Sequence, residues 1–591
     1  MSDFSRREVL SLAASAALAG LAAKVSEADE LHTARAAVHA GVPPELSRFI
    51  EHYLRAMHSP GLTLALTTRA DTGYVASFGY ANLDRHTPVT TADRFQIGSL
   101  SKSFVALVIL QLQDEGKLDV QHSVLRYLPW LPIEAAEGEI RIHHLLTHTA
   151  GMPANTQVVS YRCEPRLRPS FAPGSHFHYC NWGYDVLGRL IEKLEAAPWS
   201  EVLVRRILAP LQMHDTAPVI ASADSRLVMG YQPRYDDRPY PPGGELVPAP
   251  ILTFDRPAGS IASTPGDMAR YMRMLLNRGV GPSGRLVSLE GFERLAKGYI
   301  DAPLMGPNIQ YGYGIGVDQL DGHKRLRHTG GLPSFASAMH LDLDAGIGAF
   351  ASINAQQGFR PEPVVEYAIR LSRAGSQRNR PVPVPPLDPT PAPLQPADYT
   401  GLYTATDGRQ VEVLQQQSQL VLVTAGTRIA LQPLENDQFI AQDARLSLFP
   451  VVFGRTDTRG TGTPEKLAAA VVDLSYGQDW YARGQSAAAD IPQDASQLQP
   501  FTGFYYSGVT VALTGAKWIV QRRGRLWLNG VIPLEPLGGA GLFRLGADPR
   551  SPETAEFQQL IDGKAQLFLL SGEPLRRTER PFPELLTLRL A

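Results

Sequence analysis

The sequence predicts an α+β domain with an antiparallel sheet and helices, followed by two small antiparallel β-barrels. Two strand-like runs, 61–66 and 74–80, are joined by turn residues and precede a strongly apolar run at 104–110. A proline-rich segment separates this part from a tail of short alternating runs. Because the tail also repeats itself, it predicts two copies of one all-β unit.

The first part begins with helical and strand-like patterns in alternation. Residues 43–57 have helical spacing, and the hairpin of residues 61–80 follows them. A strand is predicted at Asp93–Ile97, before the apolar run that starts at Phe104. That run continues only to Gly116, where a helix can end, so it predicts a buried helix and not a membrane span.

A Ser-x-x-Lys motif lies where this strand meets the helix. Ser99 and Lys102 are three residues apart on the predicted first turn, so the hydroxyl and the amine share a face. A serine needs a base to become nucleophilic, and burial lowers the pKa of a lysine enough to make it that base. The alternative is a solvated helix start. Ser101 and Ser103 lack a lysine three residues further on.

The triplet Tyr179-Cys180-Asn181 follows a Pro-Gly pair and precedes a helical pattern. Alternate residues of an extended turn point the same way, so Tyr179 and Asn181 can face one cleft while Cys180 turns inward. A tyrosine near a lysine ammonium ionises more readily and can act as a general acid or base. The alternative is a purely structural triplet.

The segment Arg327–Gly331 and the runs 337–344 and 348–354 predict antiparallel strands with a glycine-rich edge beside a cleft. Glycines there let a substrate backbone approach, and His328 and Thr329 can hydrogen-bond its carbonyl or carboxylate. A plain hairpin is the alternative.

Two other stretches predict structure alone. His144 and His148 have the spacing of metal ligands, but no glutamate lies between them, so we expect hydrogen bonds and no metal. Residues 258–267 lead into a helix that Thr264 or Asp267 can cap, and we expect them to be scaffold.

Composition excludes several classes of protein. The 591 residues carry a formal net charge of -2, so a nucleic-acid partner is not expected. Only Cys163 and Cys180 are present, which excludes a disulfide framework and a cysteine-rich zinc site. One bridge is possible in an oxidising compartment, although two buried thiols are the expectation.

The first 28 residues predict a targeting segment. Ser5–Leu10 contains paired arginines and precedes an alanine-rich run at 11–23, which resembles a twin-arginine export signal cleaved after Ala28. An alanine-rich amphipathic helix is the alternative. No cysteine follows the run, so we expect no membrane anchor after cleavage and a periplasmic or secreted protein.

Together the motifs Ser99–Lys102, Tyr179–Asn181 and His328–Gly330, in this order, resemble a known family of serine hydrolases. It holds class C β-lactamases, D-alanyl-D-alanine carboxypeptidases, D-aminopeptidases and related esterases. The run 145–153 is similar to the same family, and the resemblance covers about residues 40–375. It implies a β-lactamase/transpeptidase-like domain that uses no cofactor.

The resemblance also implies a role for each residue. Ser99 would attack the carbonyl, with Lys102 and Tyr179 handling the proton, and Asn181 would orient the acyl amide. His328, Thr329 and Gly330 would contact the substrate. The amides of Ser99 and Gly331 would form the oxyanion hole.

One position departs from the class C β-lactamases, which carry lysine where His328 stands. A neutral histidine offers a substrate carboxylate a hydrogen bond but no permanent charge. The departure weakens the interpretation of this chain as a β-lactamase. The His-Thr-Gly motif is similar to that of carboxypeptidase and esterase members of the family.

The tail contains an internal repeat, since residues 394–403 resemble residues 498–505. Similar lipocalin-like tails occur in D-aminopeptidase relatives, where they border the active site; a spacer or an oligomerisation module is the alternative. The predicted divisions are a signal peptide at 1–28, a hydrolase domain at 29–375, a linker at 376–397 and barrels at 398–485 and 486–591.

These observations predict an exported serine hydrolase that acts through an acyl-enzyme on small peptides or amides containing D-amino acids. An esterase or a weak β-lactamase would use the same residues. A non-catalytic, penicillin-recognising sensor is a further alternative. The exact substrate and the oligomeric state are left open by the sequence.

Overall fold

A computed structural model describes most of the chain. The described residues are 41–134, 138–154, 168–235, 238–240, 243–251, 253–355, 360–375, 381–387, 395–435, 437–455, 470–484, 495–506, 516–522, 524–578 and 590. The predicted export signal, Cys163 and most of the predicted linker lie outside them. Among the described residues, no helix combines the length and apolarity that a membrane crossing requires.

The first domain is built on an antiparallel sheet of nine described strands in the order β10-β11-β12-β13-β14-β15-β1-β2-β3. The N-terminal hairpin joins strands that come almost 300 residues later, since Leu64 of β1 lies opposite Ala351 of β15. The strands are β1 (Gly61–Thr68), β2 (Thr72–Asn82), β3 (Thr87–Pro88), β10 (Ile300–Asp301), β11 (Gln310–Tyr311), β12 (Gly316–Leu320), β13 (His323–Leu332), β14 (Phe335–Asp342) and β15 (Ile347–Ile353).

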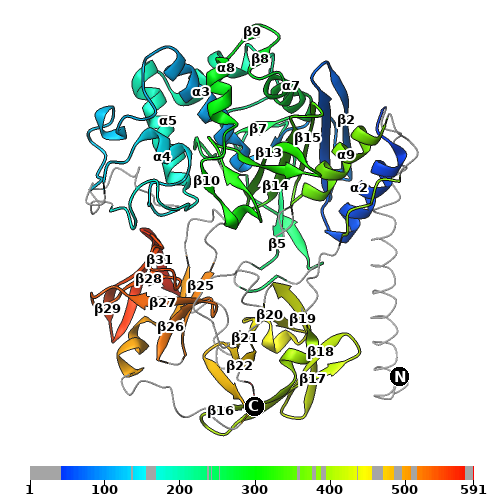
Figure 1. Ribbon diagram of the computed structural model, residues 1–591. Coiled ribbons are helices and arrows are strands. Elements are labelled where there is room, and N and C mark those ends of the chain that lie inside the picture. Colours follow the sequence, from blue (N-terminus) through cyan, green and yellow to red (C-terminus); the bar gives the residue numbers. More distant parts are fainter. Residues whose placement is uncertain are drawn as a thin grey trace, which may run out of the picture.

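Helices cover both faces of this sheet (Figure 1). On one face, α2 (Pro44–Ala56) and α9 (Glu362–Ala374) share a buried cluster with residues of β1, β14 and β15. On the other face, α7 (Pro265–Leu276) and α3 (Ser101–Asp114) belong to a second, larger cluster. The other helices of this domain are α4 (Ile142–Leu146), α5 (Asn181–Glu195), α6 (Trp199–Leu203) and α8 (Leu289–Leu295). The predicted α+β class is therefore confirmed.

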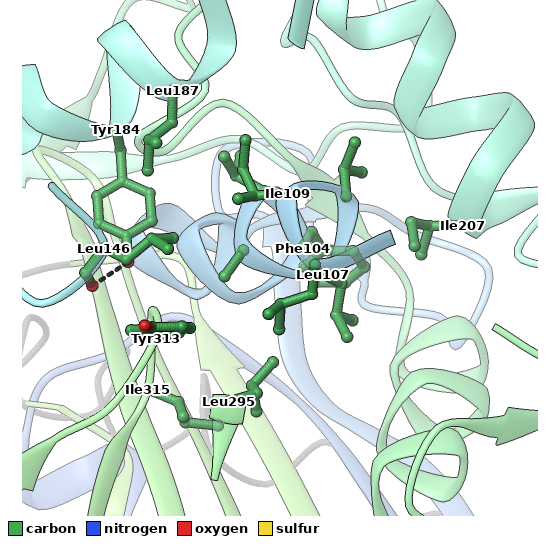
Figure 2. Close-up of a cluster of buried hydrophobic side chains, with 14 of the residues drawn as sticks. Phe104, Leu107, Ile109, Leu146, Tyr184, Leu187, Ile207, Leu295, Tyr313 and Ile315 are labelled. Atoms are coloured by element: carbon green, nitrogen blue, oxygen red, sulfur yellow. Dashed lines mark hydrogen bonds between the residues drawn. The ribbon is translucent and has the colours of Figure 1, made fainter. Parts of the chain in front are cut away.

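Helix α3 is buried on all sides, as its unbroken apolar run requires. Figure 2 shows Phe104 and Leu107 of α3 among side chains from α4, α5, α8 and the turn between β11 and β12. The helix ends at Asp114, and Gly116 follows in a left-handed conformation with a φ of 71°.

The strand predicted at Asp93–Ile97 is shorter than expected. Only Phe95–Gln96 (β4) pairs, and its partner is Ala262–Ser263 (β7), outside the main sheet. Ile97 turns to a helical conformation and Gly98 to a left-handed one with a φ of 55°, which ends the strand. Thr264 caps α7 by accepting from the Asp267 amide at 3.3 Å, so the predicted cap is confirmed.

The tail forms two closed antiparallel barrels, each with eight described strands, which confirms the prediction. The first barrel comprises β16 (Gly401–Ala405), β17 (Gln410–Gln416), β18 (Gln419–Thr424), β19 (Thr427–Glu435), β20 (Gln438–Ala441), β21 (Val451–Arg455), β22 (Val471–Tyr476) and β23 (Asp479–Arg483). The second comprises β24 (Gly503–Tyr506), β25 (Ala516–Arg522), β26 (Arg525–Leu528), β27 (Ile532–Pro536), β28 (Leu542–Leu545), β29 (Thr554–Ile561), β30 (Lys564–Leu570) and β31 (Glu573–Thr578).

The sequence repeat corresponds to the same closing corner in both barrels. The Tyr403 hydroxyl donates to the carbonyl four residues earlier at 2.6 Å, and the Tyr505 hydroxyl does so at 2.9 Å. An arginine from the last strand then donates to the chain in front of the first strand, to the Thr400 carbonyl in one barrel and the Thr502 carbonyl in the other. The duplicated residues are therefore the closure points of the barrels.

Candidate active site

Ser99 lies in a 3₁₀ turn, Gly98–Leu100, directly before α3. It is therefore not on the first α-helical turn as predicted, although Lys102 is, and the spacing of three residues still brings the side chains together. The Ser99 side chain is half-buried while Gly98 and Leu100 are buried. The turn thus leaves the Ser99 side chain partly exposed while the residues on either side of it are buried.

Lys102 is fully buried, and its ammonium has three acceptors. Its Nζ donates to Ser99 Oγ at 3.0 Å, to Asn181 Oδ1 at 2.7 Å and to the Ala258 carbonyl at 2.8 Å. Burial lowers the pKa of Lys102 to about 7, against an opposing effect of Asp185. At neutral pH a substantial fraction of Lys102 is therefore the free amine.

The geometry defines what that free amine can do. A neutral amine keeps two N–H groups and one lone pair. The Asn181 and Ala258 oxygens can only accept, so they take the two N–H groups and leave the lone pair for the Ser99 hydroxyl. Lys102 can therefore take the proton of Ser99 as a general base.

The Ala258 carbonyl is held in place by α5. Asp185 Oδ1 accepts from the Ala258 amide at 3.3 Å, and its Oδ2 accepts from Arg256 Nε at 2.9 Å. The prediction that residues 258–267 serve only as scaffold is therefore wrong at Ala258, because its backbone oxygen contacts Lys102 directly. Backbone contacts of this kind leave no signature in the residue type.

Tyr179 adjoins the same pair. The Lys102 Nζ lies 4.9 Å from the centre of the Tyr179 ring. Burial raises the pKa of Tyr179 above its ordinary value, and a hydrogen bond to Ser99 and the charge of Arg360 only partly offset this. The expectation that the lysine makes Tyr179 ionise more readily is therefore wrong: the phenol stays protonated and is suited to donating a proton.

Asn181 begins α5, directly after the extended Cys180. Its amide N–H donates to the Ala154 carbonyl at 2.8 Å, while its side-chain oxygen accepts from Lys102. The side chain of Asn181 thus orients the amine of Lys102. Orientation of a substrate amide by Asn181 stays a prediction.

His328 is buried on β13, and both of its ring nitrogens have partners. Nδ1 donates to the Thr329 carbonyl at 2.7 Å, so Nε2 is the acceptor for the Tyr311 hydroxyl at 2.9 Å. Burial, helped by Lys102, lowers the pKa of His328 to about 3. The expected hydrogen bond from His328 to a substrate is therefore corrected: this neutral ring orients β13 and Tyr311, and only Thr329 of the pair is half-exposed.

Glycines bring β13 against the turn that carries Ser99. A Cβ on Gly330 would lie 1.9 Å from the Ile97 carbonyl oxygen, and a Cβ on Gly98 would lie 2.8 Å from the Gly331 amide nitrogen. Ser337 Oγ also donates to the Ile97 carbonyl at 2.8 Å. The Gly331 amide nitrogen therefore lies beside the Ser99 turn, and its part in an oxyanion hole stays a prediction.

Arg360 is a site residue that the sequence did not reveal. Its Nη1 donates to the Gly330 carbonyl at 2.6 Å, and its charge affects the pKa of Tyr179 after the effects of burial and the Ser99 hydrogen bond. No motif marks this arginine. Asp185, in contrast, stands four residues after Asn181, and that helical spacing could have indicated it.

His144 and His148 are hydrogen-bonded, as predicted. His144 Nδ1 accepts from the Arg141 amide at 3.2 Å, and His148 Nδ1 accepts from the Cys180 amide at 3.0 Å. Within the described part of the chain, no group of three or more His, Cys, Asp or Glu side chains could hold a metal ion. Cys180 is a buried, unbridged thiol among the described residues.

The chain is similar to known proteins over most of its first domain. A family model described as beta-lactamase matches residues 46–374, more than half of the chain. Penicillin-binding protein 4 of Amycolatopsis lactamdurans is 27% identical over 369 residues, which cover 59% of this chain and 94% of that protein. Penicillin-binding protein 4* of Bacillus subtilis (strain 168) is 25% identical over 405 residues, covering 64% and 87%.

A solved structure extends the likeness in fold. The octameric penicillin-binding protein homologue from Pyrococcus abyssi is similar with a TM-score of 0.50 and 24% identity. The match covers 74% of this chain and 99% of that one.

Proposed function

This chain belongs to the beta-lactamase family of serine hydrolases, and we propose that it hydrolyses small peptides or amides containing D-amino acids through an acyl-enzyme on Ser99. The observation that carries the proposal is the contact between Ser99 and Lys102. The two atoms lie 3.0 Å apart, and burial lowers the pKa of Lys102 to about 7. A base of that pKa is suited to work at neutral pH.

In the proposed acylation, Ser99 Oγ attacks the substrate carbonyl carbon while its proton passes to Lys102 Nζ. The amides of Ser99 and Gly331 stabilise the oxyanion, and one such donor is worth about 3 kcal/mol. The phenol of Tyr179 then donates a proton to the leaving nitrogen as the C–N bond breaks, and it regains a proton from Lys102. In deacylation, water attacks the ester carbonyl carbon while Tyr179 takes a proton from the water and passes its own proton to Lys102. Lys102 then returns a proton to Ser99 Oγ as the bond from the acyl carbon to Ser99 Oγ breaks.

The charges around the site favour a substrate with a free carboxylate. His328 is neutral and hydrogen-bonded, so it supplies no cation. Arg360 supplies one beside Gly330 and Tyr179. We therefore place a carboxypeptidase activity before an aminopeptidase activity, because only the former requires a carboxylate next to the scissile bond.

The relatives support recognition of a β-lactam as well. Two of them are named penicillin-binding proteins, and we extend that recognition to this chain. A β-lactam would acylate Ser99 and be released slowly or not at all.

We also propose that the protein is exported through the paired arginines of Ser5–Leu10. The test is to measure how much protein accumulates outside the cytoplasm. We expect this accumulation to be lost in an Arg6→Lys/Arg7→Lys variant.

The function is tested by comparing the mature protein with its Ser99→Ala variant. Both are offered a D-alanyl-D-alanine peptide, a D-amino-acid amide, a short-chain ester and a β-lactam. We expect turnover of the peptide by the parent protein alone, and a stable mass increase of the parent with the β-lactam. Preference for the ester would make the protein an esterase. A lasting adduct without any turnover would make it a sensor, and equal behaviour of the two proteins would refute the role of Ser99.

A further inference from the structure

The second barrel contacts the rim of the candidate active site. In Figure 1 it lies beneath the side of the first domain that carries α4 and α5. Its loop before β29 contacts the first domain at Ala154 and again between Ser170 and His178. Ser170 Oγ donates to the Arg550 carbonyl at 2.7 Å, and His176 Nε2 lies 4.0 Å from Asp548 Oδ2.

Glu553 makes the contacts nearest to Tyr179. Its Oε1 accepts from the Ala154 amide at 2.7 Å and from His178 Nε2 at 2.8 Å. Its Oε2 accepts from Ser571 within its own barrel. Ala154 and His178 come from different segments of the first domain, so a single carboxylate bridges the two segments and attaches both to the barrel.

Those two segments are the ones that hold Tyr179. The His148 carbonyl accepts from the His178 amide at 2.8 Å, and His148 Nδ1 accepts from the Cys180 amide at 3.0 Å. The Ala154 carbonyl accepts from the Asn181 amide at 2.8 Å. Every residue from 178 to 181 except Tyr179 is thus bonded to the segment 148–154, and Glu553 closes this arrangement at the Ala154 end.

The Glu553 carboxylate is charged at neutral pH. Burial raises the pKa of Glu553, but the donors of His178, Ser571 and Ala154 more than offset it, so the pKa lies below its ordinary value. A charged acceptor makes stronger hydrogen bonds than a neutral one. The hydrogen bonds of Glu553 are therefore strong, and the one to Ala154 joins residues that are 399 positions apart in the sequence.

We propose that Glu553 is a positioning residue of the active site: by binding the Ala154 amide and His178 together, it fixes the orientation of Tyr179 and Asn181 relative to Ser99 and Lys102. The second barrel then contributes to catalysis, because it supplies the residue that positions the active site. This inference depends on the proposed function, because it assigns the bridge a role in the chemistry on Ser99.

Loss of the bridge should affect rate more than binding. Asn181 orients Lys102 through a 2.7 Å hydrogen bond, and Tyr179 must reach the leaving group. A small displacement of such groups can lower a rate by about a hundredfold. Substrate affinity should change little, because Thr329, Gly331 and Arg360 lie on other elements.

The test uses the full-length protein and three variants. Glu553→Ala removes the acceptor, and we expect kcat to fall about tenfold to a hundredfold with KM within about twofold. Glu553→Gln keeps an oxygen for both donors, so we expect at least a third of the parental kcat. Ser170→Ala is the matched control, because it removes another contact with the same loop without touching residues 178–181, and its kcat should be that of the parent.

A second readout does not depend on activity. Hydrogen exchange of peptides spanning residues 148–154 and 178–182 should be faster in Glu553→Ala than in the parent. In Ser170→Ala the peptide of residues 178–182 should exchange as in the parent, and it is the deciding readout because Ser170 Oγ also bonds the Gly151 carbonyl of the other segment at 3.5 Å. Parental kcat and exchange in Glu553→Ala would overturn the inference. So would an equal loss in Ser170→Ala, which would mean general docking, or a Glu553→Gln as slow as Glu553→Ala. If Ser99→Ala retained turnover, the proposed function would fail separately, while the exchange experiment would still report on the bridge.

Discussion

The acylation rate should follow the titration of Lys102. Only the neutral amine can take the proton of Ser99, and burial lowers the pKa of Lys102 to about 7. About half of the lysine is then neutral at pH 7 and about a tenth at pH 6. We therefore expect acylation to be half-maximal near pH 7 and to fall about tenfold for each further pH unit towards acid.

An Asp185→Asn variant should move this profile. The charge of Asp185 stabilises the ammonium of Lys102 and so raises its pKa, whereas that of Arg256 lowers it. Removing the carboxylate charge takes away this stabilisation while the charge of Arg256 remains, so the pKa of Lys102 falls. An opposite charge nearby shifts a pKa by about one to three units, and we expect a fall of about one unit, because Asp185 is connected to Lys102 through the backbone of Ala258.

The assay is single-turnover acylation between pH 5 and pH 9, followed by stopped flow with a chromogenic β-lactam or ester. Asparagine keeps an oxygen for the Ala258 amide, so the position of the Ala258 carbonyl should be retained. Asp321→Asn is the matched control, since Asp321 pairs with Arg370 at 3.0 Å and is not among the groups that shift the pKa of Lys102. A parental profile that is flat from pH 5 to pH 8, or a midpoint that moves towards alkali in Asp185→Asn, would refute the role of Lys102 as the base.

Three further variants test the remaining contacts. Tyr311→Phe leaves His328 Nε2 buried without a donor, so the free energy of unfolding should fall by about 1–3 kcal/mol in urea, and an unchanged midpoint would contradict the assigned hydrogen bond. Gly330→Ala places a Cβ against the Ile97 carbonyl and should displace the Ser99 turn, lowering acylation at least about tenfold; a normal burst would show that β13 can move aside. Arg360→Ala should raise KM about tenfold for substrates with a free carboxylate and leave neutral esters unaffected, whereas an equal effect on both would make Arg360 structural.

Much of the candidate site could be predicted from the spacing of residues in the sequence. Ser99 and Lys102 are three residues apart, and no packing detail is needed to bring their side chains together. The apolar run of α3, the Thr264 cap and the repeated closing corners of the barrels are likewise encoded within a few residues of each other. Such features follow from helical and strand periodicity, so the sequence alone determined them, together with the α+β class and the two barrels.

The chemical state of the site was decided by tertiary structure. Lys102 obtains its third acceptor from the backbone of Ala258, and Tyr311 engages the nitrogen of His328 that a substrate was expected to meet. The phenol of Tyr179 stays protonated because burial has a larger effect on its pKa than the charges around it. Glu553 reaches Ala154 across 399 residues. Desolvation and hydrogen bonding depend on which distant segments close around a group, and no local pattern of residue types encodes that.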